Sequence, residues 1–408
     1  MEDIKLIQET IEADVMCVGG GIAGLMASIR AAEMGVKAVV AEKGNALGSG
    51  RGCSGNDHFW CYIPEVHGTD MDSFMKECLK GPKLKVLQSG TSTQVLRTFL
   101  ANSFDIVKLW DSWGIPMKYK GKWEFAGHTF PGDVFTHLKY QGQNQKSILV
   151  KKALEKGVRI VNRVMILDLL TDGEKVIGAI GINTRENKII VFKAKSVVVG
   201  TGFVDRLYPP PVPGWMTSSP GWPTLTGDGR AMVYRAGAEL VGVEIFRRHM
   251  GPRYFARFGQ ATWVGVLRGP DDKPVGPYVT KPDKLYGDMT AEVSSVILED
   301  YLKSGRGPTY MDGRGISNED HDYMMHWLTH EGSAALLNNM KEEGIDYRKN
   351  PVEFGTYHPI MEGKICINEK AQTSMKGLFA AGDESVASMG PSAVYGWLAG
   401  ENAALHAK

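Results

Sequence analysis

Cysteine is scarce in the sequence and never has the spacing of a metal or cluster site. The five cysteines among 408 residues are odd in number and widely separated: Cys17, Cys53, Cys61, Cys78 and Cys366. No two of them form a Cys-x-x-Cys pair, the spacing typical of iron–sulfur and zinc sites. The sequence therefore predicts reduced thiols, no metal ligands and no iron–sulfur cluster held by this chain itself.

Net charge and long apolar runs are also lacking. Forty-seven basic and 46 acidic residues leave a formal charge of +1, so no overall field attracts nucleic acid or an anionic membrane. No apolar run approaches the ~18 residues that span a bilayer. The start of the chain lacks the charged-then-apolar order of a secretion signal. We expect a cytoplasmic protein with no direct membrane span and no nucleic acid as partner.

Glycine, in contrast, is abundant, and 49 glycines without low complexity indicate many tight turns and close approaches of the backbone to a ligand. The first of these glycines stand between two apolar segments, 13–18 and 36–41, and lead into a helical pattern over 25–34. Glu42 ends the second apolar segment. This order predicts a buried strand, a helix and a second buried strand, which form a βαβ unit.

Three glycines of this unit occupy the G-x-G-x-x-G positions of a dinucleotide-binding turn. Gly19 allows the tight turn, Gly21 lets the backbone approach a pyrophosphate, and Gly24 lets helix and strand pack closely. The helix N-terminus then faces the phosphates, and Glu42 can accept a hydrogen bond from a ribose hydroxyl. We therefore expect a bound dinucleotide.

The rest of the chain returns to the same sheet at its end. Two helices, a small antiparallel meander, two buried strands and a final helix are expected at 92–113, 147–156, 158–194, 196–199, 378–381 and from 391 onwards. The six prolines of 208–223 predict an ordered surface loop. Glycine-rich turns follow both late strands, at Gly200-Thr-Gly202 and at Gly382. A chain that begins and ends on one nucleotide-binding sheet must insert its remaining material between the two ends.

Four motifs cover nearly the whole chain in order. They are Gly19–Gly24 with Glu42-Lys43, Gly200-Thr-Gly202, Thr226-Gly-Asp-Gly229 followed by Arg235-Ala-Gly-Ala238, and Gly377-Leu-Phe-Ala-Ala-Gly-Asp383. In order and spacing they resemble the flavoprotein subunits of the fumarate reductase/succinate dehydrogenase family. The resemblance implies an α/β fold, with a Rossmann-like FAD-binding domain of the glutathione-reductase type and an inserted α+β capping domain. We expect the FAD-binding domain at 1–247 and 357–408, and the capping, substrate-binding domain at 248–356.

The resemblance implies FAD, not NAD, as the cofactor. Glu42 would hold the adenosine ribose, and Asp383 would face the ribityl and pyrophosphate region. The final helix from Ser392 would point its positive end at the flavin N1/C2 carbonyl. The residues expected to contact FAD lie in the glycine-rich turns, beside them, and at the start of the last helix: Gly19, Gly21, Ile22, Ala23, Gly24, Glu42, Lys43, Ser49, Gly50, Ser54, Gly55, Asn56, Val164, Gly200, Thr201, Gly202, Asp228, Gly382, Asp383, Ser392 and Ala393.

The family often attaches FAD covalently through a histidine shortly after the second strand. The corresponding stretch here, Gly48–Asn56, contains no histidine, and the next one in the chain is His58. We therefore expect dissociable FAD, with His58 as a covalent anchor the alternative. Ser49, Ser54 and Asn56 are expected as polar contacts of the isoalloxazine ring.

The family also has histidines at the two hinges between its domains. The first stands five residues after a glutamate, which matches Glu244 and His249. The second lies in His358-Pro-Ile-Met-Glu-Gly363, which is similar to the family's His-Tyr-Thr-Met-Gly-Gly. The substrate-facing, catalytic residues expected on this basis are His249, Arg253, Arg268 and His358. Arg268 would be the proton donor, although Arg268-Gly-Pro keeps only the first two residues of the family's Arg-Gly-Glu-Gly-Gly.

One part of the family's dicarboxylate site is missing. The family carries a second substrate-binding arginine before the last helix, but this chain reads Gly390-Pro-Ser-Ala-Val-Tyr-Gly396 there. A dicarboxylate held at both ends needs two cationic groups, so the loss argues against succinate and fumarate. Five of the 17 arginines nonetheless gather within 22 residues: Arg247, Arg248, Arg253, Arg257 and Arg268. They favour either recognition of a small oxyanion beside the flavin or a solvated basic face with salt bridges.

Within the family, the sequence is similar to the alpha subunit of adenylylsulfate reductase in Trp113-Gly-Ile-Pro116, Gly121-Lys-Trp123 and Tyr140–Lys146. That flavoprotein passes electrons to a separate ferredoxin-like subunit, so a ferredoxin-like iron–sulfur subunit is the partner that the likeness implies. The sequence stops after the last expected FAD-domain helix, so no C-terminal helical domain is expected. The oligomeric state stays open, an oligomer included.

These observations predict an FAD-dependent oxidoreductase that moves a hydride or an electron pair between flavin N5 and a small anionic substrate, as a flavoprotein subunit with an iron–sulfur partner. Two alternatives stay open. One is a flavin monooxygenase, because that group also has a Gly-Asp pair near its C-terminus. The other is an electron-transfer flavin subunit without a substrate, whose clustered arginines dock an acidic iron–sulfur protein.

Overall fold

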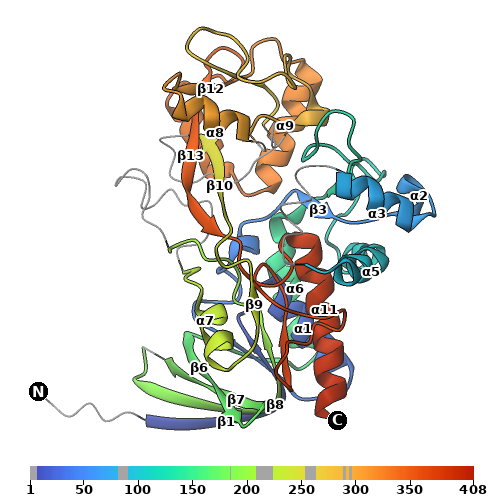
Figure 1. Ribbon diagram of the computed structural model, residues 1–408, viewed down its shortest axis with the longest axis vertical. Coiled ribbons are helices and arrows are strands. Elements are labelled where there is room, and N and C mark those ends of the chain that lie inside the picture. Colours follow the sequence, from blue (N-terminus) through green and yellow to red (C-terminus); the bar gives the residue numbers. More distant parts are fainter. Residues whose placement is uncertain are drawn as a thin grey trace, which may run out of the picture.

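The computed structural model describes residues 7–80, 91–183, 185–207, 224–252, 263–287, 291–293 and 296–408, apart from the side chains of 247–249 and 357–359. The proline-rich segment expected to be an ordered loop lies outside the described residues, as do Arg253 and Arg257. The molecule is elongated, with a large sheet and its covering helices at one end and a smaller group of strands and helices at the other (Figure 1).

Helices and strands alternate along most of the chain. The strands are β1 (Ile7–Val18), β2 (Ala38–Glu42), β3 (His58–Trp60), β4 (His137–Lys139), β5 (Arg159–Asn162), β6 (Val164–Asp172), β7 (Lys175–Asn183), β8 (Lys188–Val199), β9 (Leu240–Val241), β10 (Phe246–Pro252), β11 (Val266–Arg268), β12 (Thr309–Asp312), β13 (Val352–Met361), β14 (Lys364–Ile365) and β15 (Leu378–Ala380). The α-helices are α1 (Ile22–Glu33), α2 (Pro64–His67), α3 (Met71–Lys80), α5 (Thr93–Ser112), α6 (Gln145–Glu155), α7 (Asp228–Arg235), α8 (Val296–Lys303), α9 (Asn318–His330), α10 (Ala334–Glu342) and α11 (Met389–Ala407).

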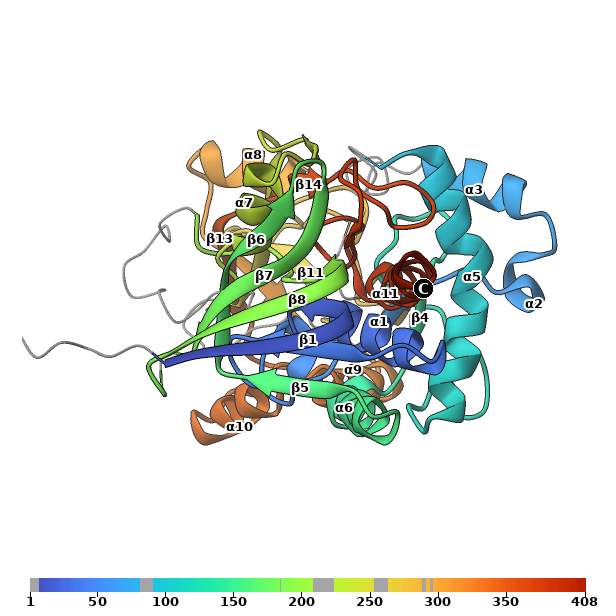
Figure 2. The same ribbon diagram turned by 90° about the horizontal axis from the view of Figure 1, so that it is seen from below.

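The large sheet has the strand order β5-β2-β1-β8-β7-β6, and β15 pairs with β8 as well. β5, β2, β1, β8 and β15 are parallel neighbours, whereas β6 and β7 are antiparallel. The central strands read as continuous apolar runs because helices cover one face of the sheet and further elements cover the other. Figure 2 shows β5, β1, β8, β7 and β6 side by side, with α1, α11 and α5 gathered on one side.

The predicted βαβ unit is confirmed, because β1 pairs in parallel with β2 and α1 connects them. The predicted meander was too long. Arg159–Asn162 forms β5, which extends the parallel part of the sheet by pairing with β2, so only β6, β7 and β8 make the antiparallel meander. The last helix begins at Met389, two residues before the proline predicted to open it.

α11 packs closely on α1 through two glycines. A Cβ atom on Gly396 would lie 2.6 Å from the Ala23 carbonyl oxygen, and one on Gly400 would lie 2.2 Å from the Ala27 oxygen. The C-terminal helix is thereby held against the first helix of the chain. This contact brings the two ends of the chain onto one sheet, with the N-terminus of α11 near the ends of β1, β8 and β15.

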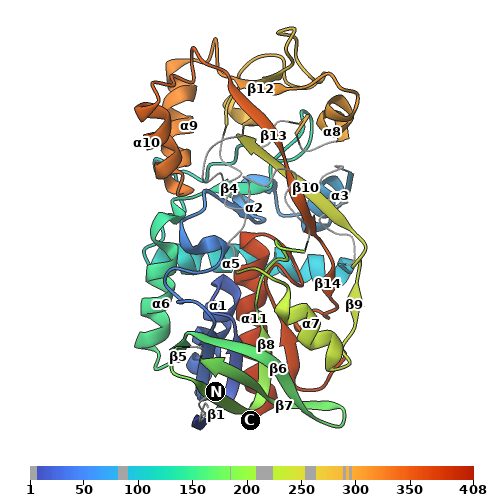
Figure 3. The same ribbon diagram turned by 90° about the vertical axis from the view of Figure 1, so that its left-hand side faces the viewer.

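A second sheet, of order β10-β13-β12-β11, lies at the other end of the molecule. It has its own hydrophobic cluster, which includes Met250, Leu267, Met311 and Phe354. β10 and β13 are antiparallel neighbours within it, and Figure 3 shows that these two strands extend from this sheet toward the large one. The predicted boundaries fall inside these two strands, and the division into two domains stays a prediction. Among the described helices, none combines the length and apolarity needed to cross a membrane.

Candidate functional site

A cavity opens where β1, β8 and β15 end, which is where ligands bind in open α/β sheets. Most of the residues predicted to contact a cofactor line it. They are Gly19, Gly21, Ile22, Ala23, Glu42, Lys43, Ser49, Gly50, Val164, Gly200, Thr201, Gly202, Asp228, Gly382, Asp383 and Ser392. The turn after the first strand and the turn after the last strand thus face each other across one cavity.

Five of the predicted contact residues do not line this cavity. Gly24 packs against the Gly19 carbonyl oxygen instead, where a Cβ atom would lie at 1.9 Å. Asn56 uses its side-chain oxygen to accept a hydrogen bond from the His58 N–H at 2.8 Å. Ser54, Gly55 and Ala393 are likewise absent from the cavity wall, and the backbone of Gly55 packs on the C-terminal end of α9. The turn after Gly52 therefore directs residues 54–56 away from the cavity.

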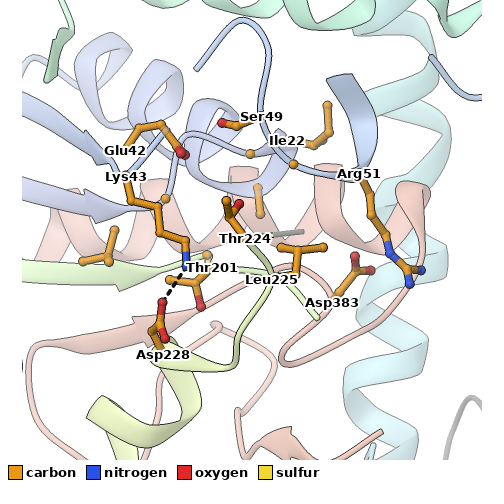
Figure 4. Close-up of a pocket in the computed structure, with 18 of the residues that line it drawn as sticks. Ile22, Glu42, Lys43, Ser49, Arg51, Thr201, Thr224, Leu225, Asp228 and Asp383 are labelled. Atoms are coloured by element: carbon orange, nitrogen blue, oxygen red, sulfur yellow. Dashed lines mark hydrogen bonds and ion pairs between the residues drawn. The ribbon is translucent and has the colours of Figure 1, made fainter. Parts of the chain in front are cut away.

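Glu42 fixes the first turn as well as facing the cavity. Its two carboxylate oxygens accept hydrogen bonds from the Gly20 N–H at 2.7 Å and the Gly44 N–H at 2.6 Å. The next residue, Lys43, donates to Asp228 at 2.6 Å and to the Thr226 hydroxyl at 2.9 Å (Figure 4). The first and third sequence motifs are therefore joined directly across the cavity mouth.

The N-terminus of α1 presents its backbone N–H groups without a side-chain cap. Its N-cap residue is Gly21, and the first turn carries no acidic residue. The ammonium of Lys146, which is 2% exposed, donates to the Gly20 carbonyl oxygen beneath this turn. Burial lowers the pKa of Lys146 to about 8, and the nearby Glu42 opposes that shift. A helix N-terminus beside a buried lysine is suited to a phosphate group.

Several residues that line the cavity were not predicted from the sequence, and one of them, Arg51, carries a charge. The Arg51 guanidinium donates to the buried Asp205 carboxylate at 3.0 Å and stacks on the Phe203 ring, 4.2 Å from its centroid. In Figure 4 it lies beside Asp383 at one end of the cavity. Arg51 lies within Gly48–Asn56, which corresponds to the stretch that carries the family's covalent histidine, and its charge is the sequence signal that points to a ligand contact. The other missed residues are Val18, Ala41, Gly52, Met165, Ile166, Thr224, Leu225, Met232 and Met389.

Residues 14–269 match the family model of the FAD binding domain. The chain belongs to this FAD-binding family. A fumarate reductase (CoM/CoB) polypeptide of Methanothermobacter marburgensis is 23% identical over 399 residues, which cover 92% of this chain and 68% of that protein. Adenylylsulfate reductase from Archaeoglobus fulgidus has a similar fold, with a TM-score of 0.79, 20% identity and coverage of 98% of this chain and 70% of that one. For the quinol fumarate reductase of E. coli the TM-score is 0.76 and the identity 22%, with coverage of 98% and 71%.

These comparisons confirm the predicted resemblance, the fold class and the cofactor. The chain is an FAD-dependent oxidoreductase of the fumarate reductase, succinate dehydrogenase and adenylylsulfate reductase family. It spans about two thirds of the length of these relatives. The described cavity fits FAD chemically, because it combines an uncapped helix N-terminus for phosphates, a carboxylate at the end of β2 for a ribose, and glycine turns that leave backbone atoms exposed to a ligand.

His58, the alternative covalent anchor, points into a different environment. Its Nδ1 is hydrogen-bonded to Asp57 at 2.7 Å, and its ring lies 4.0 Å from His128 and 5.7 Å from His137, between centroids. Asp57 also accepts from the fully buried Lys139 ammonium at 2.8 Å. Asp57, His58 and Glu331 have the ligand-atom spacing of a metal site, but the Lys139 ammonium already supplies a positive charge there. His58 does not line the FAD cavity, which favours the dissociable cofactor.

The two hinge histidines lie on neighbouring strands. His249 is on β10 and His358 on β13, and the backbone register pairs Arg248 with Pro359. The side chains of both histidines, and all of Arg253, lie outside the described residues. Their catalytic roles stay predictions.

Arg268 lies elsewhere. It ends β11, which β12 separates from β13, and the register aligns it with Tyr310 and then with Glu353, five residues before His358 on β13. Its guanidinium donates to Asp312 at 2.7 Å and to the Asp272 carbonyl oxygen at 2.8 Å. It lines a separate pocket that shares no residue with the FAD cavity. This geometry favours a structural role over the predicted proton donation.

We expect Arg268→Met to lower stability and to leave turnover unchanged. Asp312 is 1% exposed and would keep Arg314 as a partner, so the loss should be about 1–2 kcal/mol. Thermal unfolding and steady-state kinetics of the same preparation measure the two effects. A fall in kcat of about 100-fold with an unchanged melting temperature would restore Arg268 as the proton donor.

Proposed function

We propose that the cavity at the ends of β1, β8 and β15 binds FAD non-covalently, and that the chain uses it to transfer a hydride or an electron pair to or from a small anionic substrate. The observation that carries the proposal is the convergence of the two glycine-rich chain ends on one cavity, with Glu42 and Asp228 on one side and Asp383 on the other. FAD supplies the redox chemistry when bound, and the protein supplies position and charge.

Each wall of the cavity has a separate task in this proposal. The N–H groups at the start of α1, backed by Lys146, hold the pyrophosphate. Glu42 accepts from the adenosine ribose while it holds Gly20 and Gly44. The Asp383 side chain accepts from the Ser388 N–H at 3.0 Å and fixes the turn before α11, whose N-terminus would stabilise negative charge on a bound flavin.

The substrate side involves β10 and β13. We propose that His249, Arg253 and His358 face the substrate, since the two strands run side by side away from the large sheet. Two histidines and an arginine suit a small oxyanion. A ferredoxin-like iron–sulfur subunit is the proposed electron partner, and the cytoplasm the proposed compartment. Adenylylsulfate is a specific candidate substrate, because the fold is similar to adenylylsulfate reductase and the second arginine of a dicarboxylate site is missing.

The decisive experiment uses the flavin itself as the probe. The purified protein is loaded with FAD, reduced without oxygen, and mixed with fumarate, enoates, adenylylsulfate or molecular oxygen. Rapid reoxidation by one of the anionic compounds, followed at the flavin absorbance band, supports the proposal and names the substrate class. Rapid NAD(P)H-dependent oxygen uptake with hydroxylation of a substrate would favour a monooxygenase, and reoxidation by an iron–sulfur protein alone would favour an electron-transfer role.

Glu42→Gln is expected to weaken FAD binding about tenfold, because one charged acceptor of the ribose and of two backbone N–H groups becomes neutral. Fluorescence titration with FAD measures the dissociation constant. Glu33→Gln is the matched control, since Glu33 lies at the other end of α1 and pairs with Arg30 and Lys156 away from the cavity. Equal affinities of the two variants would contradict the role proposed for Glu42.

A further inference from the structure

A buried arginine joins three distant segments behind the FAD cavity. Arg230 lies in the first turn of α7 and is 2% exposed. Its side chain donates to three backbone carbonyl oxygens. Nη1 donates to that of Gly202 at 2.8 Å, Nη2 to that of Asp383 at 3.1 Å, and Nε to that of Gly363 at 2.5 Å. The planar guanidinium is suited to such an arrangement because its donors point outward in fixed directions.

Two of these segments are walls of the cavity, and the third connects β13 to β14. Gly202 and Asp383 line the cavity from the ends of β8 and β15. Gly363 stands between β13 and β14, where the chain returns from the second sheet. A Cβ atom on Gly363 would lie 2.7 Å from the Val243 Cα, so the outgoing chain passes closely there as well.

The outgoing and returning chains are bonded to each other beside this point. The Glu362 N–H donates to the Ile245 carbonyl oxygen at 2.8 Å, and β10 then pairs with β13 from Phe246 onwards. An interaction that restrains Gly363 therefore also restrains the neighbouring ends of β10 and β13. Figure 3 shows β10 and β13 leaving this region together.

Acidic side chains lie around the arginine and oppose the effect of its burial. Burial lowers the pKa of Arg230, while Glu384, Asp383, Glu362 and Asp205 act in the opposite direction. Glu384 is itself fully buried and accepts hydrogen bonds from the Thr201 N–H and hydroxyl at 2.5 and 2.7 Å. The same carboxylate that balances Arg230 thus also holds the turn between Gly200 and Gly202.

We propose that Arg230 is a positioning residue that couples FAD binding to the placement of β10 and β13. FAD in the cavity restrains Gly202 and Asp383. Because the Arg230 guanidinium is hydrogen-bonded to both, its position becomes restrained as well. The bond from the same guanidinium to Gly363 then restrains the link between β13 and β14. The coupling is reciprocal, so strands already in place also favour FAD. This inference rests on the proposed function, which places FAD in this cavity.

Hydrogen exchange of the full chain tests the coupling, with free FAD as the probe. In the wild type, FAD is expected to slow exchange of the Phe246–Pro252 and Val352–Met361 amides about fivefold or more. In Arg230→Met the same FAD saturation should leave exchange in these two strands nearly unchanged. Arg235→Met is the matched control, because Arg235 lies on the same helix but is 50% exposed and pairs with Asp168 at the surface.

Two further measurements keep the test decisive. Arg230→Lys keeps the charge but not the three donor directions, so it should bind FAD and lose most of the strand protection even where the Met variant fails to fold. The coupling also predicts weaker FAD binding in Arg230→Lys, by the same factor as the lost protection. Strand protection equal to the wild type in FAD-loaded Arg230→Lys would overturn the inference. Failure of the wild type to bind FAD would instead overturn the proposed function.

Discussion

Gly24→Ala is expected to abolish FAD binding and to destabilise the fold by about 3 kcal/mol. A Cβ atom at this position would lie 1.9 Å from the Gly19 carbonyl oxygen, which is a backbone atom of the turn that β1 makes into α1. The turn cannot yield in the opposite direction, because a Cβ on Gly19 would itself lie 2.4 Å from the Gly200 oxygen. The helix must therefore move away from the strand, and its N-terminus leaves the phosphate site.

Thermal unfolding and FAD titration of the same variant measure both effects. Gly48→Ala is the control, because Gly48 lies in a turn of the same region, has no left-handed backbone, and would place a Cβ atom with no other atom within 4 Å. We expect the control to keep wild-type affinity and to change stability by about 0.5 kcal/mol or less. Wild-type FAD affinity in Gly24→Ala would show that the cofactor does not depend on this helix–strand contact.

The βαβ unit and a dinucleotide ligand were predictable because their signals are local, whereas FAD in particular was implied by the family resemblance of four motifs spread over the chain. A glycine pattern between two apolar runs specifies a turn whatever the rest of the chain does. The return of the last strand to the same sheet was also predictable, since Gly382 follows an apolar run in the way that Gly200 does. The contact of the two ends at one cavity then follows from sheet topology.

The interactions that the sequence did not reveal join residues far apart in the chain. Arg268 on β11 pairs with Asp312 on the adjacent β12, 44 positions away, and its charge alone gives no sign of that partner. Arg230 reaches Gly363 over 133 positions. Asn56 was expected at the flavin because of its residue type, but its short-range hydrogen bond to the His58 N–H turns it elsewhere. The roles of these three side chains depend on how deeply each is buried and on which residue it hydrogen-bonds, and a local sequence pattern predicts neither.

Glu384→Gln is expected to change how stability depends on pH. Burial raises the pKa of Glu384 from 4.5 to about 7, against the opposing effects of Arg230 and of the hydrogen bonds from Thr201. A carboxyl whose pKa is higher in the folded than in the unfolded state favours folding below its unfolded pKa, and this contribution is lost as pH rises toward the folded pKa. The wild type should therefore lose about 2–3 kcal/mol of stability between pH 5 and pH 8 through this one group.

The Gln variant cannot lose a proton, so its stability relative to the wild type should rise by that amount over the same pH interval. Asp383, whose pKa burial also raises, titrates in both proteins, and its charge is one of the causes that raise the pKa of Glu384. Denaturant unfolding at pH 5 and pH 8 measures the two free energies, and Glu239→Gln, which changes an exposed carboxyl just before β9, is the control. A constant difference between Glu384→Gln and the wild type at both pH values would show that Glu384 does not change its protonation state over this interval. In that case the two hydrogen bonds from Thr201 to Glu384 persist unchanged, and the position of the turn does not vary with pH.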